Sequence, residues 1–167
     1  MIILICGYPG VGKTTLANEL ASYIDAVVLS SDKVRKELID KPSYTEEEKS
    51  LVYNILLLIS KYIHNARINC IIDATFNSQR SREDVKKRLN LGNDQYKIIE
   101  CICPEDLIIS RIQKRKNDYS DADLSIYRRI KEIYEPIKES HITVDTSVSL
   151  KKIIPEVAKK LVHKDEI

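Results

Sequence analysis

The stretch Gly7-Tyr8-Pro9-Gly10-Val11-Gly12-Lys13-Thr14 matches the pattern G-x-x-x-x-G-K-[ST] at every fixed position. Its glycines let the backbone turn tightly, so that the backbone N–H groups can face inward and surround an anion. In this motif the lysine reaches the β- and γ-phosphates of a nucleotide, and the threonine hydroxyl suits a Mg²⁺ ion. The stretch therefore predicts a P-loop that binds the phosphates of a nucleoside triphosphate.

The segments on either side of this loop support the motif. Residues 1–6 form an apolar run that ends at glycine, which is typical of a buried parallel strand. Residues 14–24 have helical spacing, and such a helix directs the positive end of its dipole at the bound phosphates. Its apolar face consists of Leu16, Ala17, Leu20, Ala21 and Ile24.

The length and composition fit one globular domain over residues 1–167. The formal net charge is +2, so the overall charge favours no particular partner. No apolar stretch reaches the ~18 residues of a membrane span, and the N-terminal run lacks the basic start of a signal peptide. The 4 cysteines fall in or beside apolar segments, which favours buried thiols over a metal site. We therefore expect a cytoplasmic protein that does not bind a membrane.

Strand-like runs alternate with helical patterns along the whole chain. We expect strands at residues 2–6, 26–30, 69–73, 96–103 and 141–145. The helical patterns between and after them include residues 81–91, 124–137 and 150–162 and a helix that starts near Pro104. This alternation predicts an α/β fold, with a five-stranded parallel sheet that carries helices on both faces.

Two of these helices carry more detailed expectations. Thr45 and Glu48 have the spacing of a capping box at a helix start. The helix that ends at residue 91 is expected to stop at Gly92. The apolar face of the helix after Thr45 is predicted at Leu51, Ile55, Leu58, Ile59, Tyr62 and Ile63.

The residues after the second strand are candidates for catalysis, because active sites in such folds lie at the carboxyl ends of the strands. Asp32 follows that strand and Arg35 lies three residues later, so the two share a helix face. The carboxylate can accept a proton from an attacking hydroxyl, and the guanidinium can bind a phosphate of the acceptor. An equally good interpretation is a helix cap at Ser31 or Asp32, with Arg35 on a solvated face.

The end of the third strand predicts a metal site and acceptor contacts. Asp73 has the position at which a carboxylate holds Mg²⁺ directly or through water, together with Thr14. The next residue is Ala74, where an ATPase that activates water usually keeps a carboxylate, so the pattern favours transfer over hydrolysis. The predicted acceptor contacts here are Thr75, Asn77 and Arg80, although turn and helix-start roles fit them equally well.

The segment after the fourth strand predicts a helical lid at about residues 109–137. Arg111 and Arg115 share a helix face there and could spread the charge of the transferred phosphoryl group. At least one of Arg128 and Arg129 is expected to face solvent. Tyr8, inside the P-loop, is expected to be exposed or to pack on the donor side.

With these features the chain resembles the P-loop kinases around the phage polynucleotide 5′-kinase and the zeta-toxin-like, AAA-type kinases. The resemblance rests on the P-loop, Asp32-Lys-Val-Arg35, Asp73 with Arg80, and Arg111-Ile-Gln-Lys-Arg115. It implies the P-loop NTPase fold, ATP and Mg²⁺ as cofactors, Asp32 as general base and Arg115 as a bridge between donor phosphates. The implied catalytic residues are Lys13, Asp32, Arg35 and Arg115. The implied nucleotide contacts are Gly7, Tyr8, Pro9, Gly10, Val11, Gly12, Lys13, Thr14, Thr15 and Arg111.

The expected function is transfer of the γ-phosphate of ATP to a hydroxyl group, first of all the 5′-OH of a polynucleotide. A basic cluster after the third strand could follow a phosphate backbone or could be a solvated helix face. Its members are Arg80, Arg82, Lys86, Lys87 and Arg88. The alternatives are a kinase of a nucleoside, sugar or antibiotic, a seryl-tRNA kinase, and a nucleotide-binding switch without activity. The D-x-x-G and N/T-K-x-D motifs of GTPases are absent.

Overall fold

A computed structural model describes residues 1–114 and 120–162 of the chain. Its centre is a parallel sheet with the strand order β2-β3-β1-β4-β5. The strands are β1 (Ile2–Cys6), β2 (Ala26–Ser30), β3 (Asn69–Asp73), β4 (Tyr96–Ile102) and β5 (Ile142–Asp145). The helices are α1 (Lys13–Ile24), α2 (Ser31–Leu38), α3 (Glu46–Asn65), α4 (Gln79–Arg88), α5 (Glu105–Lys114), α6 (Leu124–Ile133) and α7 (Leu150–Val162), with a 3₁₀ turn η1 at Asn93–Gln95. The predicted α/β fold with five parallel strands is confirmed.

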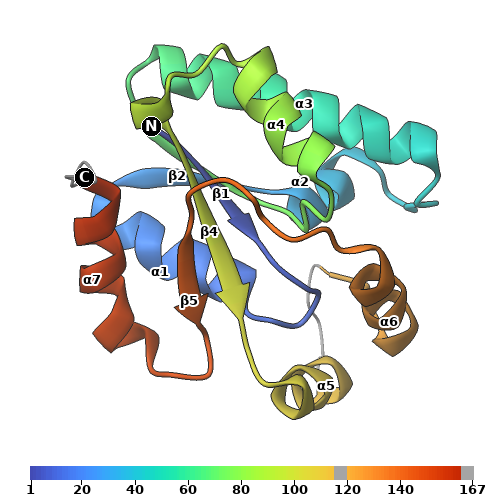
Figure 1. The fold of residues 1–167 in the computed structure, drawn as a ribbon. Helices are drawn as coiled ribbons and strands as arrows, with labels where there is room; N and C mark the ends of the chain where they lie inside the picture. Colours follow the sequence, from blue (N-terminus) through green and yellow to red (C-terminus); the bar gives the residue numbers. More distant parts are fainter. Residues whose placement is uncertain (115–119, 163–167) are drawn as a thin grey trace.

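Helices cover both faces of the sheet, as Figure 1 shows, with α3 and α4 on one side and α1 and α7 on the other. The strand β1 is fully buried because its side chains alternate between two apolar cores. Ile3 and Ile5 belong to the core under α1 and α7, whereas Ile2 and Leu4 belong to the core under α3 and α4. This is why the strand is a continuous apolar run rather than an alternating one. The predicted burial is confirmed for Cys6, Cys70 and Cys101, whereas Cys103 is only half-buried.

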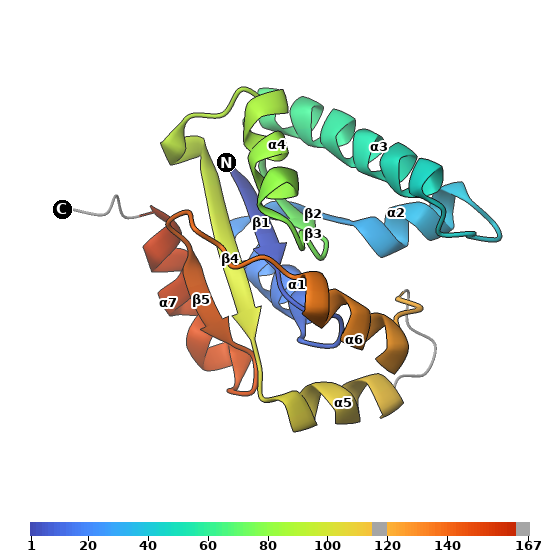
Figure 2. The same ribbon diagram turned by 45° about the vertical axis from the view of Figure 1, so that its right-hand side comes forward.

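The helices α5 and α6 lie beyond the carboxyl ends of β1 and β4, as Figure 2 shows. They are attached to the core on the α1 side through Ile108, Ile112 and Tyr127. They are also joined to each other, because Glu105 accepts hydrogen bonds from Tyr127 Oη (3.2 Å) and Lys131 Nζ (2.8 Å). The lid predicted over residues 109–137 thus includes most of α5 and all of α6.

The buried face of α3 differs from the predicted one. The side chains that face the sheet are Val52, Leu56, Leu57 and Ser60. Of the predicted face, Leu51, Leu58, Ile59 and Tyr62 are exposed. The prediction was wrong because α3 carries two apolar stripes, and helical spacing alone cannot show which of the two packs on the sheet.

The C-terminus of α4 also differs from the prediction. The helix ends at Arg88 with Leu89 as its C-cap, and the next residue, Asn90, has a left-handed φ of 52°. Asn90 N–H donates to Lys87 O (3.2 Å) and Leu91 N–H donates to Lys86 O (3.0 Å), which is the Schellman arrangement. Gly92 instead lies at the start of η1 with a φ of −71°, so its glycine character is not needed to end α4.

Arg82 of α4 is fully buried, although the sequence placed it in a basic surface cluster. Its Nη1 donates to Phe76 O (2.7 Å), and its Nη2 donates to Glu135 O and Pro136 O (3.1 Å each). The arginine therefore joins α4 to the loop after β3 and to the segment after α6. It is a structural residue and cannot follow a nucleic-acid backbone.

We expect Arg82→Met to lower the free energy of unfolding by roughly 2–4 kcal/mol, because the buried guanidinium and its hydrogen bonds to the carbonyls of Phe76, Glu135 and Pro136 are lost. Urea unfolding followed by circular dichroism measures this change. Arg80→Met is the matched control, since Arg80 lies two residues earlier and is exposed. It should change stability by less than about 0.5 kcal/mol. Equal losses in both variants would contradict the structural role of Arg82.

Candidate active site

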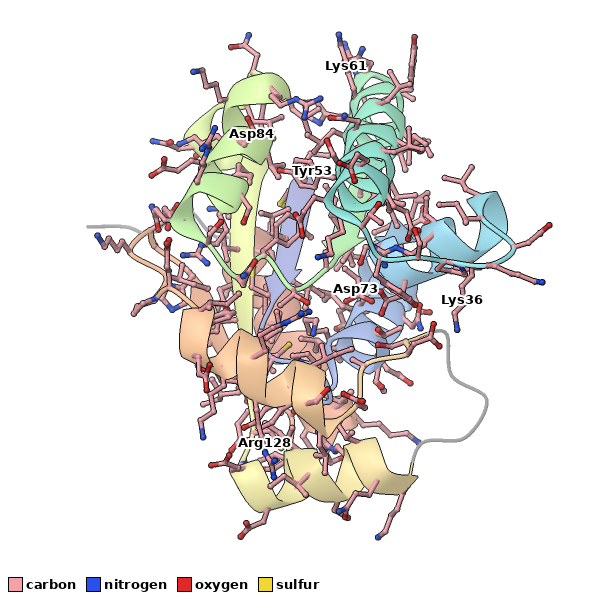
Figure 3. All side chains as sticks on the ribbon, turned by 90° about the vertical axis from the view of Figure 1, so that its right-hand side faces the viewer. Lys36, Tyr53, Lys61, Asp73, Asp84 and Arg128 are labelled. Carbon is pink, nitrogen blue, oxygen red and sulfur yellow. The ribbon has the colours of Figure 1, made fainter. Side chains whose placement is uncertain are left out.

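A cleft of about 930 Å³ opens at the carboxyl ends of the strands, between the P-loop, α2, the start of α3, and α6. Figure 3 shows Asp73, at the end of β3, in the middle of this region. The predicted site residues that line the cleft are Pro9, Gly10, Gly12, Lys13, Thr14, Thr15, Asp32, Arg35, Asp73, Thr75, Asn77 and Arg111. Gly7, Tyr8, Val11 and Arg80 are not among the lining residues, and Arg115 lies outside the residues that the structure describes.

The P-loop backbone has a conformation that requires glycine at Gly7. Its φ is 136°, and a Cβ atom there would lie only 2.7 Å from the carbonyl oxygen of Cys101. The loop leads directly into α1, whose N-cap is Gly12 with a φ of 102°. The N-terminus of α1 therefore lies at the cleft, where its dipole and its free N–H groups favour an anion.

The side chain of Lys13 folds back onto the backbone of the P-loop. Its Nζ donates hydrogen bonds to Gly7 O (3.0 Å) and Tyr8 O (2.9 Å), and the residue lines the cleft. The ammonium group is thus held by two backbone carbonyls beside the N-terminus of α1. Cation and helix dipole together make this end of the cleft positive.

Thr14 and Asp73 form a close oxygen pair on the other side of the loop. Thr14 Oγ1 donates to Asp73 Oδ2 at 2.6 Å, and Asp73 is 3% exposed. Burial raises the pKa of Asp73 above its ordinary value, while the charge of Lys13 and the hydrogen bond from Thr14 oppose this shift. One carboxylate and one hydroxyl suit Mg²⁺, which usually takes few protein ligands and completes its shell with phosphate oxygens and water.

Asp32 lies in the first turn of α2 and lines the cleft. The N-cap of this helix is Ser30, so the interpretation of Ser31 or Asp32 as the cap is wrong. The side chain of Asp32 keeps 37% of its surface exposed, and its Oδ1 lies 3.3 Å from Arg35 Nη1. A half-exposed carboxylate that is not used as a cap is free to contact a ligand.

Arg35 is buried and has two further partners that sequence reasoning missed. Its Nε lies 3.0 Å from Glu48 Oε1, in an ion pair that does not have hydrogen-bond geometry, and its guanidinium lies over the ring of Tyr44 at 4.9 Å. The predicted capping box is only half formed, since Thr45 Oγ1 accepts from Glu48 N–H (3.3 Å) but Glu48 turns to Ser43 and Tyr44. The box pattern at Glu48 was the available signal, although it indicated a helix cap and not a partner for Arg35.

The carboxyl group of Glu48 is stabilised in its charged form. Burial alone would raise its pKa, but hydrogen bonds from Ser43 and Tyr44 and the charge of Arg35 outweigh burial. The pKa of Glu48 therefore lies below its ordinary value, and the ion pair with Arg35 is between two charged groups.

Arg111 lines the cleft and also donates hydrogen bonds to the backbone of the P-loop and to Thr146. Its Nη1 donates to Val11 O (3.1 Å) and to Thr146 Oγ1 (3.2 Å), and its Nη2 donates to Thr146 O (2.8 Å). The guanidinium thus joins α5, the P-loop and the loop before α7. Thr146, which the sequence did not single out, also donates from its hydroxyl to Val11 O.

Tyr8 of the P-loop contacts the predicted lid. Its ring packs on Tyr127 and Tyr134, with ring centroids 5.9 Å and 4.9 Å apart, so it anchors the P-loop to α6 and the segment after it. Arg128 and Arg129 are both exposed, and of the two only Arg129 lines the cleft. Figure 3 shows Arg128 on the side of α6 that faces α5.

A polar bridge links the segment before α6 to α2 and the loop after it. Asp121 accepts from Lys36 Nζ at 2.7 Å and from Tyr44 Oη. The hydrogen bond from Lys36 and then that from Tyr44 lower the pKa of Asp121, while burial and Asp121 raise the pKa of Tyr44 to about 12. Because Tyr44 and Asp121 both line the cleft, this bridge bounds the end of the cleft near Asp32.

Comparison with known proteins identifies relatives of this chain. The family model described as "AAA domain" matches residues 2–137. Uncharacterized proteins of Mycobacterium bovis and Mycobacterium tuberculosis are 29% identical over 140 residues, and the match covers 75% of this chain and 28% of each relative. The chain thus spans little more than a quarter of the length of these relatives.

Several solved structures share the fold. A sugar kinase from a Janibacter species has a TM-score of 0.74 at 18% identity, covering 95% of this chain and 92% of that one. The APS kinase of Mycobacterium tuberculosis, in complex with AMPPNP and APS, has a TM-score of 0.71 at 16% identity, covering 97% of both chains. A gluconokinase from Sinorhizobium meliloti has a TM-score of 0.67 at 14% identity, covering 95% and 90%. The fold is therefore that of the P-loop kinases.

In the described part of the chain, no helix has the length and apolar character to cross a membrane.

Proposed function

The chain belongs to the AAA domain family, and on that premise we propose that it is a kinase that transfers the γ-phosphate of ATP to a hydroxyl group of a small molecule. The observation that carries the proposal is that one cleft brings together Lys13 and Thr14 from the P-loop and Asp32 from α2. The kinase domain comprises residues 1–167, with a lid at about residues 109–137.

The P-loop end of the cleft is the donor half. The backbone N–H groups of the loop, the N-terminus of α1 and Lys13 bind the phosphates of ATP. Thr14 and Asp73 are the residues that would hold a Mg²⁺ ion, and a bound ion would neutralise charge on the phosphate oxygens. Arg111 fixes the loop through its hydrogen bond to Val11 O.

Asp32 is the general base of the acceptor half. As the acceptor oxygen bonds to the γ-phosphorus, its proton passes to the carboxylate of Asp32, and the bond from phosphorus to the bridging oxygen of ADP breaks. Ala74 follows Asp73 at the cleft, so this position offers no carboxylate to activate water. The arrangement thus favours transfer over hydrolysis.

A small acceptor fits the cleft better than a polynucleotide. The basic cluster on α4 lacks a continuous row of free cations, because Arg82 is buried and Arg88 is paired with Asp84 (3.5 Å) and Asn54 (2.9 Å). The bridge at Asp121 bounds the acceptor end. The structural relatives named as sugar kinase, gluconokinase and APS kinase support an acceptor of this size. Thr75 and Asn77 are the proposed acceptor contacts, whereas Arg80 is exposed outside the cleft.

Incubation with γ-³²P-labelled ATP, Mg²⁺ and separate panels of sugars, nucleosides and 5′-OH oligonucleotides tests the proposal. We expect label in a small acceptor and little free phosphate when no acceptor is present. Labelled oligonucleotides, with a rate that falls steeply with salt, would show a polynucleotide kinase instead. Release of phosphate without transfer would show a hydrolase, and would contradict the proposed reaction.

A further inference from the structure

The acceptor side of the cleft contains a chain of three charged side chains, Glu48, Arg35 and Asp32. Glu48 Oε1 lies 3.0 Å from Arg35 Nε, and Arg35 Nη1 lies 3.3 Å from Asp32 Oδ1. The exposed fraction of the side chain rises from 7% at Glu48 to 10% at Arg35 and 37% at Asp32. These three side chains thus connect a buried carboxylate on α3 with the half-exposed carboxylate at the cleft.

Arg35 is held from three directions. Glu48 contacts its Nε, Asp32 contacts its Nη1, and the ring of Tyr44 covers one face of the guanidinium at 4.9 Å. A buried planar group that lies between two carboxylates and an aromatic ring has little rotational freedom. This geometry suits a group that orients Asp32. It does not suit a group that must turn toward each new acceptor to bind a phosphate with two parallel hydrogen bonds.

Glu48 has a separate task for each of its oxygen atoms. Its Oε2 accepts hydrogen bonds from Ser43 N–H (2.6 Å), Ser43 Oγ (2.8 Å) and Tyr44 N–H (3.1 Å), which fixes the loop that carries Tyr44. Its Oε1 is left for Arg35. Glu48 therefore holds Arg35 directly at Nε and indirectly through the position of the Tyr44 ring.

The charges along the chain alternate. Arg35 lies between two carboxylates, so the buried Glu48 balances its positive charge from within the protein. Asp32 can then accept a proton without leaving the guanidinium as an unpaired buried cation, which would be costly. A network of this kind supports a catalytic group only if all its members are present.

We propose that Glu48 and Arg35 are positioning residues that hold the carboxylate of Asp32 in line with the acceptor hydroxyl. The proposal rests on the proposed kinase function, in which Asp32 is the general base. It replaces the expectation that Arg35 grips a phosphate of the acceptor, so the acceptor needs no phosphate beside the hydroxyl that reacts.

Glu48→Gln tests this with little change in shape. The amide oxygen can keep the three hydrogen bonds from Ser43 and Tyr44, and the amide NH₂ then faces Arg35 Nε, a donor against a donor. We expect kcat to fall by up to about 10²-fold, since small misplacements of reacting groups have effects of this size. The KM values of ATP and of the acceptor should change little. Glu47→Gln, which removes an exposed carboxylate one residue away, should keep full activity.

A double-mutant cycle shows whether Glu48 acts through Arg35. The double variant Arg35→Met/Glu48→Gln should be no slower than Arg35→Met alone, because the two residues act in one chain. The double variant also avoids a buried unpaired charge, so it keeps the test valid if a single variant unfolds. Additive losses would overturn the proposal. If Arg35→Met raised the KM of the acceptor and left kcat unchanged, the proposal would also be overturned, because Arg35 would then bind the acceptor.

Asp32→Asn in the same assay tests the general base separately from the positioning role of Glu48 and Arg35. If Asp32→Asn is inactive while Glu48→Gln retains full kcat, the positioning chain is wrong and the kinase proposal stands. If Asp32→Asn is fully active, the general-base assignment itself fails. The ¹⁵N-edited NMR signal of Arg35 Nε–H gives a readout without catalysis. It should shift in Glu48→Gln and stay in place in Glu47→Gln, and an unchanged signal in both would contradict the ion pair.

Discussion

Asp32→Asn is expected to slow phosphoryl transfer by about 10²–10⁴-fold while the affinity for ATP stays near that of the wild type. The amide cannot take a proton from the acceptor hydroxyl, but it can keep the contact with Arg35 through its oxygen. The P-loop contacts of Lys13 and the pair of Thr14 and Asp73 do not involve Asp32, so donor binding is preserved. Steady-state rates with labelled ATP and the Kd from isothermal titration measure the two quantities.

Glu37→Gln is the control for this prediction. Glu37 lies on the same helix α2, is exposed, and pairs only at 3.8 Å with the exposed Lys33. The substitution removes the same charge from the same helix without touching the cleft, and should leave the rate within about 2-fold of wild type, as surface ion pairs contribute little. An Asp32→Asn enzyme as fast as Glu37→Gln would show that another group takes the proton.

Lys13→Ala is expected to lower the transfer rate by about 10²–10³-fold, the usual loss when one preorganised donor to the developing charge is removed. ATP affinity should fall as well, because the lysine contacts phosphates in the ground state and in the transition state. Folding should be nearly unaffected. The hydrogen bonds that Lys13 Nζ makes are with the carbonyls of Gly7 and Tyr8, and the Thr14–Asp73 contact is independent of them.

Lys151→Ala removes an exposed lysine from the first turn of α7, outside the cleft, and serves as the reference. It should change neither rate nor ATP affinity. Thermal unfolding of both variants with and without ATP and Mg²⁺ checks the assignment further, since only Lys151→Ala should retain the full stabilisation by the nucleotide. Retained stabilisation in Lys13→Ala would place the donor phosphates elsewhere.

The strands and the P-loop could be predicted from the sequence because local pattern and tertiary role coincide there. Predicted and observed bounds agree for β1, β2 and β3, and differ by one residue at one end of β4 and of β5. A buried parallel strand is apolar on both faces, so a short apolar run between turns has few other structures open to it. The same reasoning failed for α3, where the choice between two apolar stripes depends on the neighbouring sheet.

The acceptor side of the cleft was harder to predict from the sequence, because its contacts join residues that are distant in the sequence. Asp32 and Arg35 could be paired by their spacing, but only the folded chain brings Glu48 to Arg35 and Asp121 to Lys36 and Tyr44. Arg82 and Arg80 look alike in the sequence, and only the packing of α4 makes one of them a buried anchor. Charged side chains are assigned to the surface by default, so buried ones are found only once their partners are known.

The strand order has a consequence for how the protein reaches its native state. β1 pairs with β3 and β4 and with no strand next to it in the chain, so residues such as Ile2 must find Cys70 and Tyr96. Pairings over such sequence separations form slowly, because the loop must be closed before the contact is made. The P-loop follows β1 and needs Cys101 of β4 beside Gly7. We therefore expect the P-loop, although it lies near residue 10, to be completed late in folding, so that nucleotide binding would report the assembly of the whole centre of the sheet.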